Sequence, residues 1–128
     1  MNTISGHKKA HIVLLILAFA ATACMELGVR KYLFKHLGYD SILAGSIPNF
    51  MAVVLITLAL TVFRGGSPLK TSIMGCFSMI LYEFAQPLIQ GRTFDLFDIA
   101  ASIIGGAFAF SLLTIVAQFF KSSTQKKD

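Results

Sequence analysis

Charged residues are scarce in this chain. They account for 13% of its 128 residues, whereas a soluble domain normally carries about 25%. Hydrophobic residues make up 55%, and the mean hydropathy is +0.74. A chain this short cannot enclose so much apolar surface in its own core, because small domains have a high ratio of surface to volume. These values argue against a soluble domain and predict one membrane domain over residues 1–128.

A concentrated basic surface is also lacking. The net charge is +5, but the basic residues flank apolar runs rather than gather on one face. We interpret them as membrane anchors and topology signals, and we expect no nucleic-acid partner.

The chain has two cysteines, Cys24 and Cys76, and both lie inside apolar runs. The sequence contains no CxxC pair and no Cys/His spacing typical of a zinc site. The three histidines, His7, His11 and His36, are not spaced as metal ligands either. We therefore predict no metal and no cofactor, and we expect the cysteines to serve as small packing residues.

The sequence does contain four apolar runs: 11–29, 47–63, 71–89 and 99–120. Each approaches the roughly 20 residues that a helix needs to cross a bilayer. The runs are continuously apolar, whereas strands of a membrane barrel would alternate. The prediction is an all-α, polytopic membrane protein whose four transmembrane helices form an antiparallel bundle. The segment between the first two runs is amphipathic, and we expect it to lie along the membrane interface.

The distribution of basic residues predicts the orientation. With four crossings, both termini and the 64–70 turn lie on one side, which holds seven basic residues: Lys8, Lys9, Arg64, Lys70, Lys121, Lys126 and Lys127. The other side holds four: Arg30, Lys31, Lys35 and Arg92. Because cytoplasmic loops carry an excess of Lys and Arg, we expect both termini in the cytoplasm.

The first run leaves a second interpretation open. Lys8 and Lys9, an apolar core and Ala21-Thr22-Ala23 resemble a secretory signal with its cleavage site, and Cys24 follows as in a lipoprotein signal. The next residues, MELGVRKYLF, do not form a flexible polar tether. We therefore favour a retained first helix over a cleaved one.

Polar residues collect where the runs reach the non-cytoplasmic side. Five polar residues lie near the non-cytoplasmic ends of the runs or in the connection between the last two: Glu26, Asn49, Glu83, Asp95 and Asp98. Glu26 fits either a pocket or an interfacial anchor, and Asn49 fits either a pocket or the start of its helix.

Within the stretch 81–98, Glu83 and Gln86 are three residues apart and share a helix face. Pro87 predicts a kink or a helix end close by. A carboxylate deep in a membrane helix costs roughly 2.5–3.5 kcal/mol. We therefore expect Glu83 to face the bundle interior and to interact with Arg92 or Gln86.

Arg92, Asp95 and Asp98 recur at intervals of three, so in a helix they would project to one side. Arg92 can then pair with Asp95, while Asp98 can cap the last helix. One interpretation of the whole polar group is an interfacial cap. A ligand-binding pocket is favoured, because the group contains more polar side chains than capping requires.

Small residues mark one face of the last run. Ala101, Gly105 and Ala109 repeat every four residues, a spacing that lets two membrane helices pack closely, and Gly106 would widen the same groove. The contact could be made within the chain or in a homo-oligomer.

The order of the polar residues resembles the VanZ-like family of small bacterial membrane proteins. The motif comprises Glu83-x-x-Gln86, Gly91-Arg92, Asp95-x-x-Asp98 and Gly105 within an apolar helix. Two positions differ from the family pattern: Gln90 stands where proline is frequent, and Ser102 where asparagine is common.

The resemblance implies a multi-pass protein of the bacterial cytoplasmic membrane, with site residues Glu83, Gln86, Arg92, Asp95 and Asp98. The family is named for a protein linked to resistance to glycopeptide antibiotics such as teicoplanin. We expect a non-catalytic cell-envelope protein that binds an amphipathic or anionic ligand: a lipid headgroup, a lipid-linked cell-wall precursor or a glycopeptide. Arg92 would hold the anionic group.

Two other functions stay open. An enzyme acting on a lipid-linked substrate could use Glu83, Asp95 and Asp98 for acid–base chemistry, although no nucleophile is obviously placed. A small proton-coupled transporter could use Glu83, although such a site is expected nearer the membrane midplane.

Overall fold

The computed structural model of the chain describes residues 2–38, 42–89, 91 and 95–126, and its regular elements over these ranges are all helical. The elements are α1 (Asn2–Cys24), the π-helical turn η1 (Met25–Val29), α2 (Arg30–Leu37), α3 (Ile42–Phe63), α4 (Pro68–Ala85), the 3-10 turn η2 (Gln86–Leu88) and α5 (Leu96–Gln125). The all-α prediction is confirmed over these described residues.

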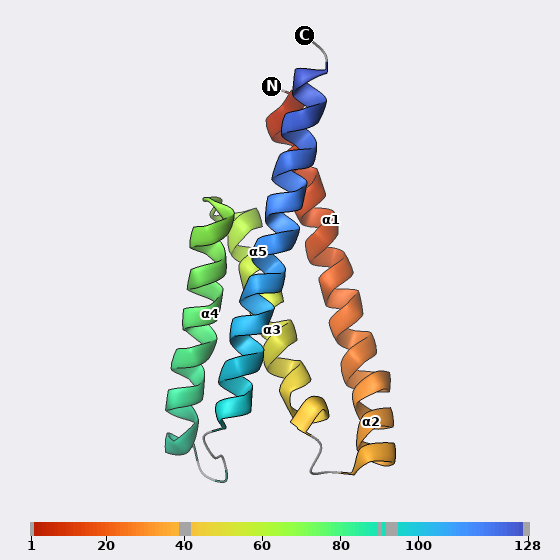
Figure 1. The fold of residues 1–128 in the computed structure, drawn as a ribbon, viewed down its shortest axis with the longest axis vertical. Helices are drawn as coiled ribbons and strands as arrows, with labels where there is room; N and C mark the ends of the chain where they lie inside the picture. The colour runs from red at the N-terminus through yellow and green to blue at the C-terminus, as the bar shows by residue number, and fades with distance from the viewer. Residues whose placement is uncertain (1, 39–41, 90, 92–94, 127–128) are drawn as a thin grey trace.

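Successive long helices run in opposite directions (Figure 1). Helices α3 and α5 pack against each other, and α1 and α4 each contact both of them. Both termini and the α3–α4 turn therefore lie toward one end, and α1 and α5 extend past that turn (Figure 1). The opposite end brings together α2, the start of α3, the end of α4 and the start of α5.

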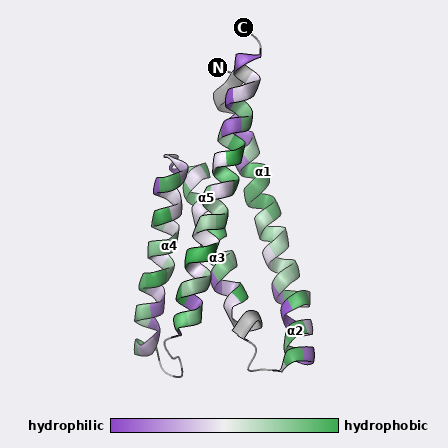
Figure 2. Cartoon of the chain, viewed as in Figure 1, coloured by the Kyte–Doolittle hydropathy of each residue, from purple (hydrophilic) through white to green (hydrophobic). Residues whose placement is uncertain are grey.

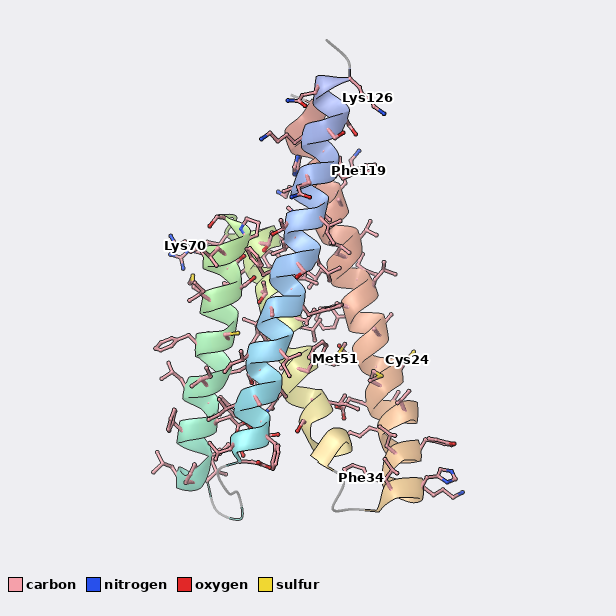
Figure 3. The ribbon with its side chains drawn as sticks, viewed as in Figure 1. Cys24, Phe34, Met51, Lys70, Phe119 and Lys126 are labelled. Carbon is pink, nitrogen blue, oxygen red and sulfur yellow. The ribbon has the colours of Figure 1, made fainter. Side chains whose placement is uncertain are left out.

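Three described helical stretches are long and apolar enough to cross a membrane: His7–Leu37, Gly45–Phe63 and Leu96–Ser123. Hydrophobic residues cover their middle lengths, whereas hydrophilic residues concentrate near the ends (Figure 2). Lys70 and Lys126 point away from the bundle toward the end that carries the termini (Figure 3). Helix α4 is not among the three; its 18 residues rise only about 27 Å and include Lys70 and Glu83.

The first helix continues further than the sequence analysis predicts. Residues 30–37 form α2, which extends the line of α1 through η1 instead of turning along the membrane interface (Figure 1). The register changes at η1, where the backbone N–H of Arg30 bonds to the carbonyl of Met25, five residues earlier. Such π turns insert one extra residue without ending the helix, so the charged residues after Val29 stay helical. The expectation of an interfacial connection over 30–37 is therefore wrong.

The prolines of α3 and α4 occupy different places: inside α3, but at the two ends of α4. Pro48 lies inside α3, which begins at Ile42 rather than near residue 47. At the start of α4, Ser67 accepts a hydrogen bond from the Lys70 amide at 3.2 Å and Pro68 occupies the first turn. At its end, Pro87 lies in η2 and Ile89 is extended. The helix end predicted near Pro87 is confirmed.

The core of the bundle lies between α3 and α5. Val54 and Leu58 of α3 meet Ala109 and Leu113 of α5, and all four side chains are buried. Elsewhere most large apolar side chains of the described helices remain exposed, as expected for surfaces that face lipid.

Glycines set how closely the three packed helices approach. A Cβ atom at Gly105 would lie 2.7 Å from the Phe50 carbonyl oxygen, so α5 rests directly on the backbone of α3. Gly106 instead faces α4, where a Cβ atom would collide with the Cys76 sulfur. The expectation that Gly106 widens the groove made by Gly105 is wrong, because adjacent helical residues point about 100° apart. A third such contact, Gly75 of α4 against Thr57 of α3, is absent from the sequence analysis.

Ala101 and Ala109 are buried on the same face of α5 as Gly105. Ala109 belongs to the core cluster with Val54 of α3. The small residues 101, 105 and 109 therefore pack within the chain in this structure. Both cysteines are free thiols: Cys24 is exposed, and Cys76 donates to the Ser102 carbonyl at 3.2 Å.

Candidate functional site

The buried carboxyl group of Glu83 connects two helices at the end of the bundle opposite the termini. Its side chain is 0% exposed. Oε1 accepts one hydrogen bond from the Asn49 amide of α3 and another from the Gln86 amide of η2, both at 2.7 Å. Gln86 is reached because it lies one helical turn beyond Glu83, and Asn49 is reached because α3 and α4 are antiparallel. Asn49 therefore bonds across helices, about two turns inside α3, rather than starting that helix.

The other oxygen of Glu83 has a different environment. Oε2 is buried and has no hydrogen-bond partner within the described parts of the chain. An unsatisfied buried acceptor of a carboxyl group costs more than the average hydrogen bond contributes. Such a group points to a partner that is supplied from outside the described residues.

A cavity of about 560 Å³ lies beside this network. Its volume falls within the roughly 300–1,000 Å³ typical of small-molecule sites. Its wall is formed by Glu26, Arg30, Gly45, Pro48, Asn49, Ala52, Met79, Tyr82, Gln86 and Asp98. Residues of η1, α2, α3, α4, η2 and α5 thus line one cavity, and four of the predicted site residues are among them: Glu26, Asn49, Gln86 and Asp98. Glu83 lies behind this wall, bonded to Asn49 and Gln86.

The first helix contributes an ion pair to the cavity. Arg30 donates to Glu26 Oε2 at 3.0 Å, and the guanidinium carbon lies 5.2 Å from the centre of the Phe34 ring. Both charged side chains are about one-third exposed, at 32% and 35%. The π turn places Glu26 inside η1 and Arg30 directly after it, and π turns are frequent at functional sites. The two readings of Glu26, pocket member and interfacial anchor, are compatible in this geometry.

At the start of α5, the capping role that the sequence analysis gives to Asp98 belongs to Asp95. Asp95 directly precedes the helix and its Oδ1 accepts from the Phe97 amide at 2.9 Å, so Asp95 is the capping residue. Asp98 lies in the first turn and lines the cavity. The expectation that Asp98 caps this helix is wrong, because the helix begins three residues earlier than the apolar run. Asp95 is exposed and lies outside the cavity wall.

Arg92, the predicted anion-binding residue, lies outside the described residues, as does Gln90 of the family motif. The predicted contacts of Arg92 with Glu83 and Asp95 therefore stay predictions. Ser102, where the family often has asparagine, is fully buried and donates to the Asp98 carbonyl at 2.9 Å.

Six residues of the cavity wall were not among the predicted site residues: Arg30, Gly45, Pro48, Ala52, Met79 and Tyr82. Arg30 was assigned to the interface, and Met79 and Tyr82 were not singled out. A signal existed for Met79, which lies four residues before Glu83 and therefore shares its helix face.

No family model matches the chain, and no curated protein and no solved structure matches it either.

Proposed function

We propose that the chain is a VanZ-like membrane protein of the bacterial cell envelope whose polar cavity binds an amphipathic ligand. The ligand would be a lipid headgroup, a lipid-linked cell-wall precursor or a glycopeptide antibiotic. The protein would act by binding rather than by catalysis.

The observation that carries the proposal is the cavity of about 560 Å³ with a buried hydrogen-bond network as its wall. Asn49 and Gln86 are only 8% and 7% exposed, yet both line the cavity. Burying a carboxyl group and two amides at the end of a small bundle is unfavourable unless their polar atoms are used. A bound polar group would use them.

The proposed membrane arrangement has four spans, with α4 as the fourth. Helix α4 contacts both α3 and α5, and its buried polar residues Thr71, Ser72 and Glu83 face protein rather than lipid. Lys126 lies at the end that holds the termini (Figure 3). Lys8 and Lys9 lie near the start of α1, and Lys121 lies near the end of α5. The positive-inside rule then places both termini in the cytoplasm and the cavity on the outer side.

The proposal is tested by filling the cavity. Ala52 lines it, and Ala20 of α1 is exposed elsewhere. We expect Ala52→Phe to reduce the lipid retained from a bacterial lipid extract, as measured by native mass spectrometry of the purified protein. Ala20→Phe adds the same side chain away from the cavity and should retain the wild-type amount. Equal retention by both variants would count against a ligand in this cavity.

A further inference from the structure

The cavity wall offers more hydrogen-bond acceptors than donors. Asn49 and Gln86 each use an amide N–H on Glu83 Oε1. An amide group bonded in this way still has its carbonyl oxygen to offer. Both residues line the cavity, and the carboxyl groups of Glu26 and Asp98 line it too. The network around Glu83 thus fixes two amides so that their acceptor ends remain for another group.

Carboxyl groups also outnumber cations here. Glu26, Glu83 and Asp98 lie at or behind the wall, while Arg30 is its one guanidinium among the described lining residues. Asp98 lines the cavity, and Glu83 lies behind the same wall, bonded to two of its lining residues. Two neighbouring carboxyl groups disfavour each other's ionisation, and a cation between them relieves the repulsion. The unpartnered Oε2 of Glu83, fully buried, independently lacks a donor within the described chain.

The side chains of the wall indicate which kind of cation they would bind. No three His, Cys, Asp or Glu side chains in the described residues come together as a set that could hold a metal ion. An organic ammonium group suits the site better, since a primary ammonium carries three N–H donors for amide and carboxyl oxygens. A quaternary ammonium has no N–H and is bound by aromatic faces instead. Tyr82 is the single aromatic side chain that the described wall provides.

Arg30 adds a second recognition element at the same cavity. Guanidinium groups bind phosphate through paired, charge-assisted hydrogen bonds. A ligand that carries a primary ammonium next to a phosphate would therefore match both the acceptor-rich wall and the guanidinium.

We propose that this cavity selects a primary ammonium group linked to a phosphate, the chemistry of an ethanolamine phospholipid headgroup, with Asn49, Gln86 and Asp98 as its acceptors. This inference rests on the proposed function, because it names the ligand class of the same cavity. Leu27 of η1 and Leu81 of α4 are exposed apolar side chains in the elements that line this cavity, and we expect the acyl chains of the lipid to pack against such residues.

The test uses the full chain in nanodiscs or detergent with equimolar phosphatidylethanolamine and phosphatidylcholine of identical acyl chains. The two headgroups differ in the three N–H donors of the ammonium. We expect native mass spectrometry to show about a tenfold preference for phosphatidylethanolamine, the size of one charge-assisted hydrogen bond. Asp98→Asn should abolish most of that preference.

Asp95→Asn provides the matched control. It removes a carboxylate three residues away, outside the cavity wall, and keeps an oxygen that can cap α5. Its preference should equal that of the wild type, and thermal unfolding of both variants should show that each is folded.

Free phosphoethanolamine distinguishes the two sources of this headgroup chemistry. If millimolar phosphoethanolamine displaces the bound lipid, the headgroup alone is recognised; if it does not, the lipid is recognised as a whole. Either result supports ammonium selection. Equal retention of the two lipids by the wild type, or an unchanged preference in Asp98→Asn, would overturn it. The two proposals are tested by separate measurements. Total lipid retained by Ala52→Phe tests whether the cavity binds a ligand, and the ratio of the two lipids in the wild type tests whether the cavity selects the ammonium group.

Discussion

At Gly105, helices α3 and α5 approach until a Cβ atom would lie 2.7 Å from the Phe50 carbonyl oxygen. At Glu83, helices α3 and α4 are instead joined by hydrogen bonds of 2.7 Å between side chains, and a cavity lies beside them. Within lipid there is little hydrophobic force between helices, so close contact of small residues provides the association. The two contacts involve adjacent residues of α3: Phe50 packs against α5, and Asn49 bonds to Glu83 of α4. Close backbone contact thus joins α3 to α5, whereas polar side chains join α3 to α4 beside a cavity with space for a ligand.

The largest loss of stability should follow from disrupting the close contact between α3 and α5 at Gly105. Gly105→Leu would place a side chain into the Phe50 backbone, which cannot move without separating α3 from α5. We expect loss of the folded protein, seen as poor recovery of monodisperse material and a lowered thermal midpoint in detergent. Gly28→Ala is the matched control, because a Cβ atom at Gly28 meets nothing within 4 Å. A Gly105→Leu protein as stable as the wild type would show that the helices do not touch there.

The next largest loss of stability should follow from removing the Glu83 carboxyl group from the hydrogen-bond network. Glu83→Ala leaves the Asn49 and Gln86 amides without their acceptor, which should cost roughly 1–3 kcal/mol of the free energy of unfolding. Glu83→Gln retains an acceptor oxygen and should cost clearly less. Unfolding in a denaturing detergent, followed by circular dichroism, measures both. Equal stability of the two variants would argue against the bonds to Oε1.

A smaller effect should appear at the contact between α4 and α5. A methyl group at Gly106 would collide with the Cys76 sulfur, so Gly106→Ala should be destabilising by itself. Once the sulfur is removed, the nearest remaining contacts of that methyl group, the Cys76 Cβ atom and the Ser72 carbonyl oxygen, lie at an ordinary 3.6 and 3.7 Å. Cys76→Ala should therefore restore most of the loss in the double variant, with a coupling of about 0.5–3 kcal/mol. If the stability changes of the two single variants simply added in the double variant, Gly106 and Cys76 would not be in contact.

The smallest effect should come from the cap of α5. Asp95→Ala removes the acceptor of the Phe97 amide and should cost about 1 kcal/mol. Hydrogen exchange of the Phe97 amide should become faster, while amides in the middle of α5 keep their rates. Asp98→Ala should leave the Phe97 amide protected. Faster exchange in Asp98→Ala but not in Asp95→Ala would show that Asp98 is the capping residue.

Much of the fold could be predicted from the sequence, because long apolar runs form most of its helices. The positions of the runs and the antiparallel order place Glu26, Asn49, Glu83 and Asp98 at one end, as observed. The helix end at Pro87 follows from a missing amide proton and needs no tertiary information. Which way each polar side chain faces depends on packing, so the bond between Asn49 and Glu83, 34 residues apart, was not predictable.

Two errors have a common cause. Residues 30–37 were expected at the interface because of their charges, and Asp98 was expected to cap because the apolar run begins after it. In both cases hydropathy was used to set a helix boundary, whereas the backbone continues its hydrogen bonds into polar sequence. Gly75 was overlooked although Ser72, Gly75 and Cys76 form a small-residue pattern in the third run.

The account depends most directly on the contact between the Glu83 carboxyl group and the Asn49 amide in a lipid bilayer. Solid-state NMR of the reconstituted protein can measure the distance from the ¹³C-labelled Glu83 carboxyl carbon to the ¹⁵N-labelled Asn49 side chain. A hydrogen bond requires these nuclei to lie within about 4 Å, and we expect strong dipolar dephasing at that distance. No detectable dephasing, in a protein whose helices are otherwise intact, would contradict the network and the binding site built upon it.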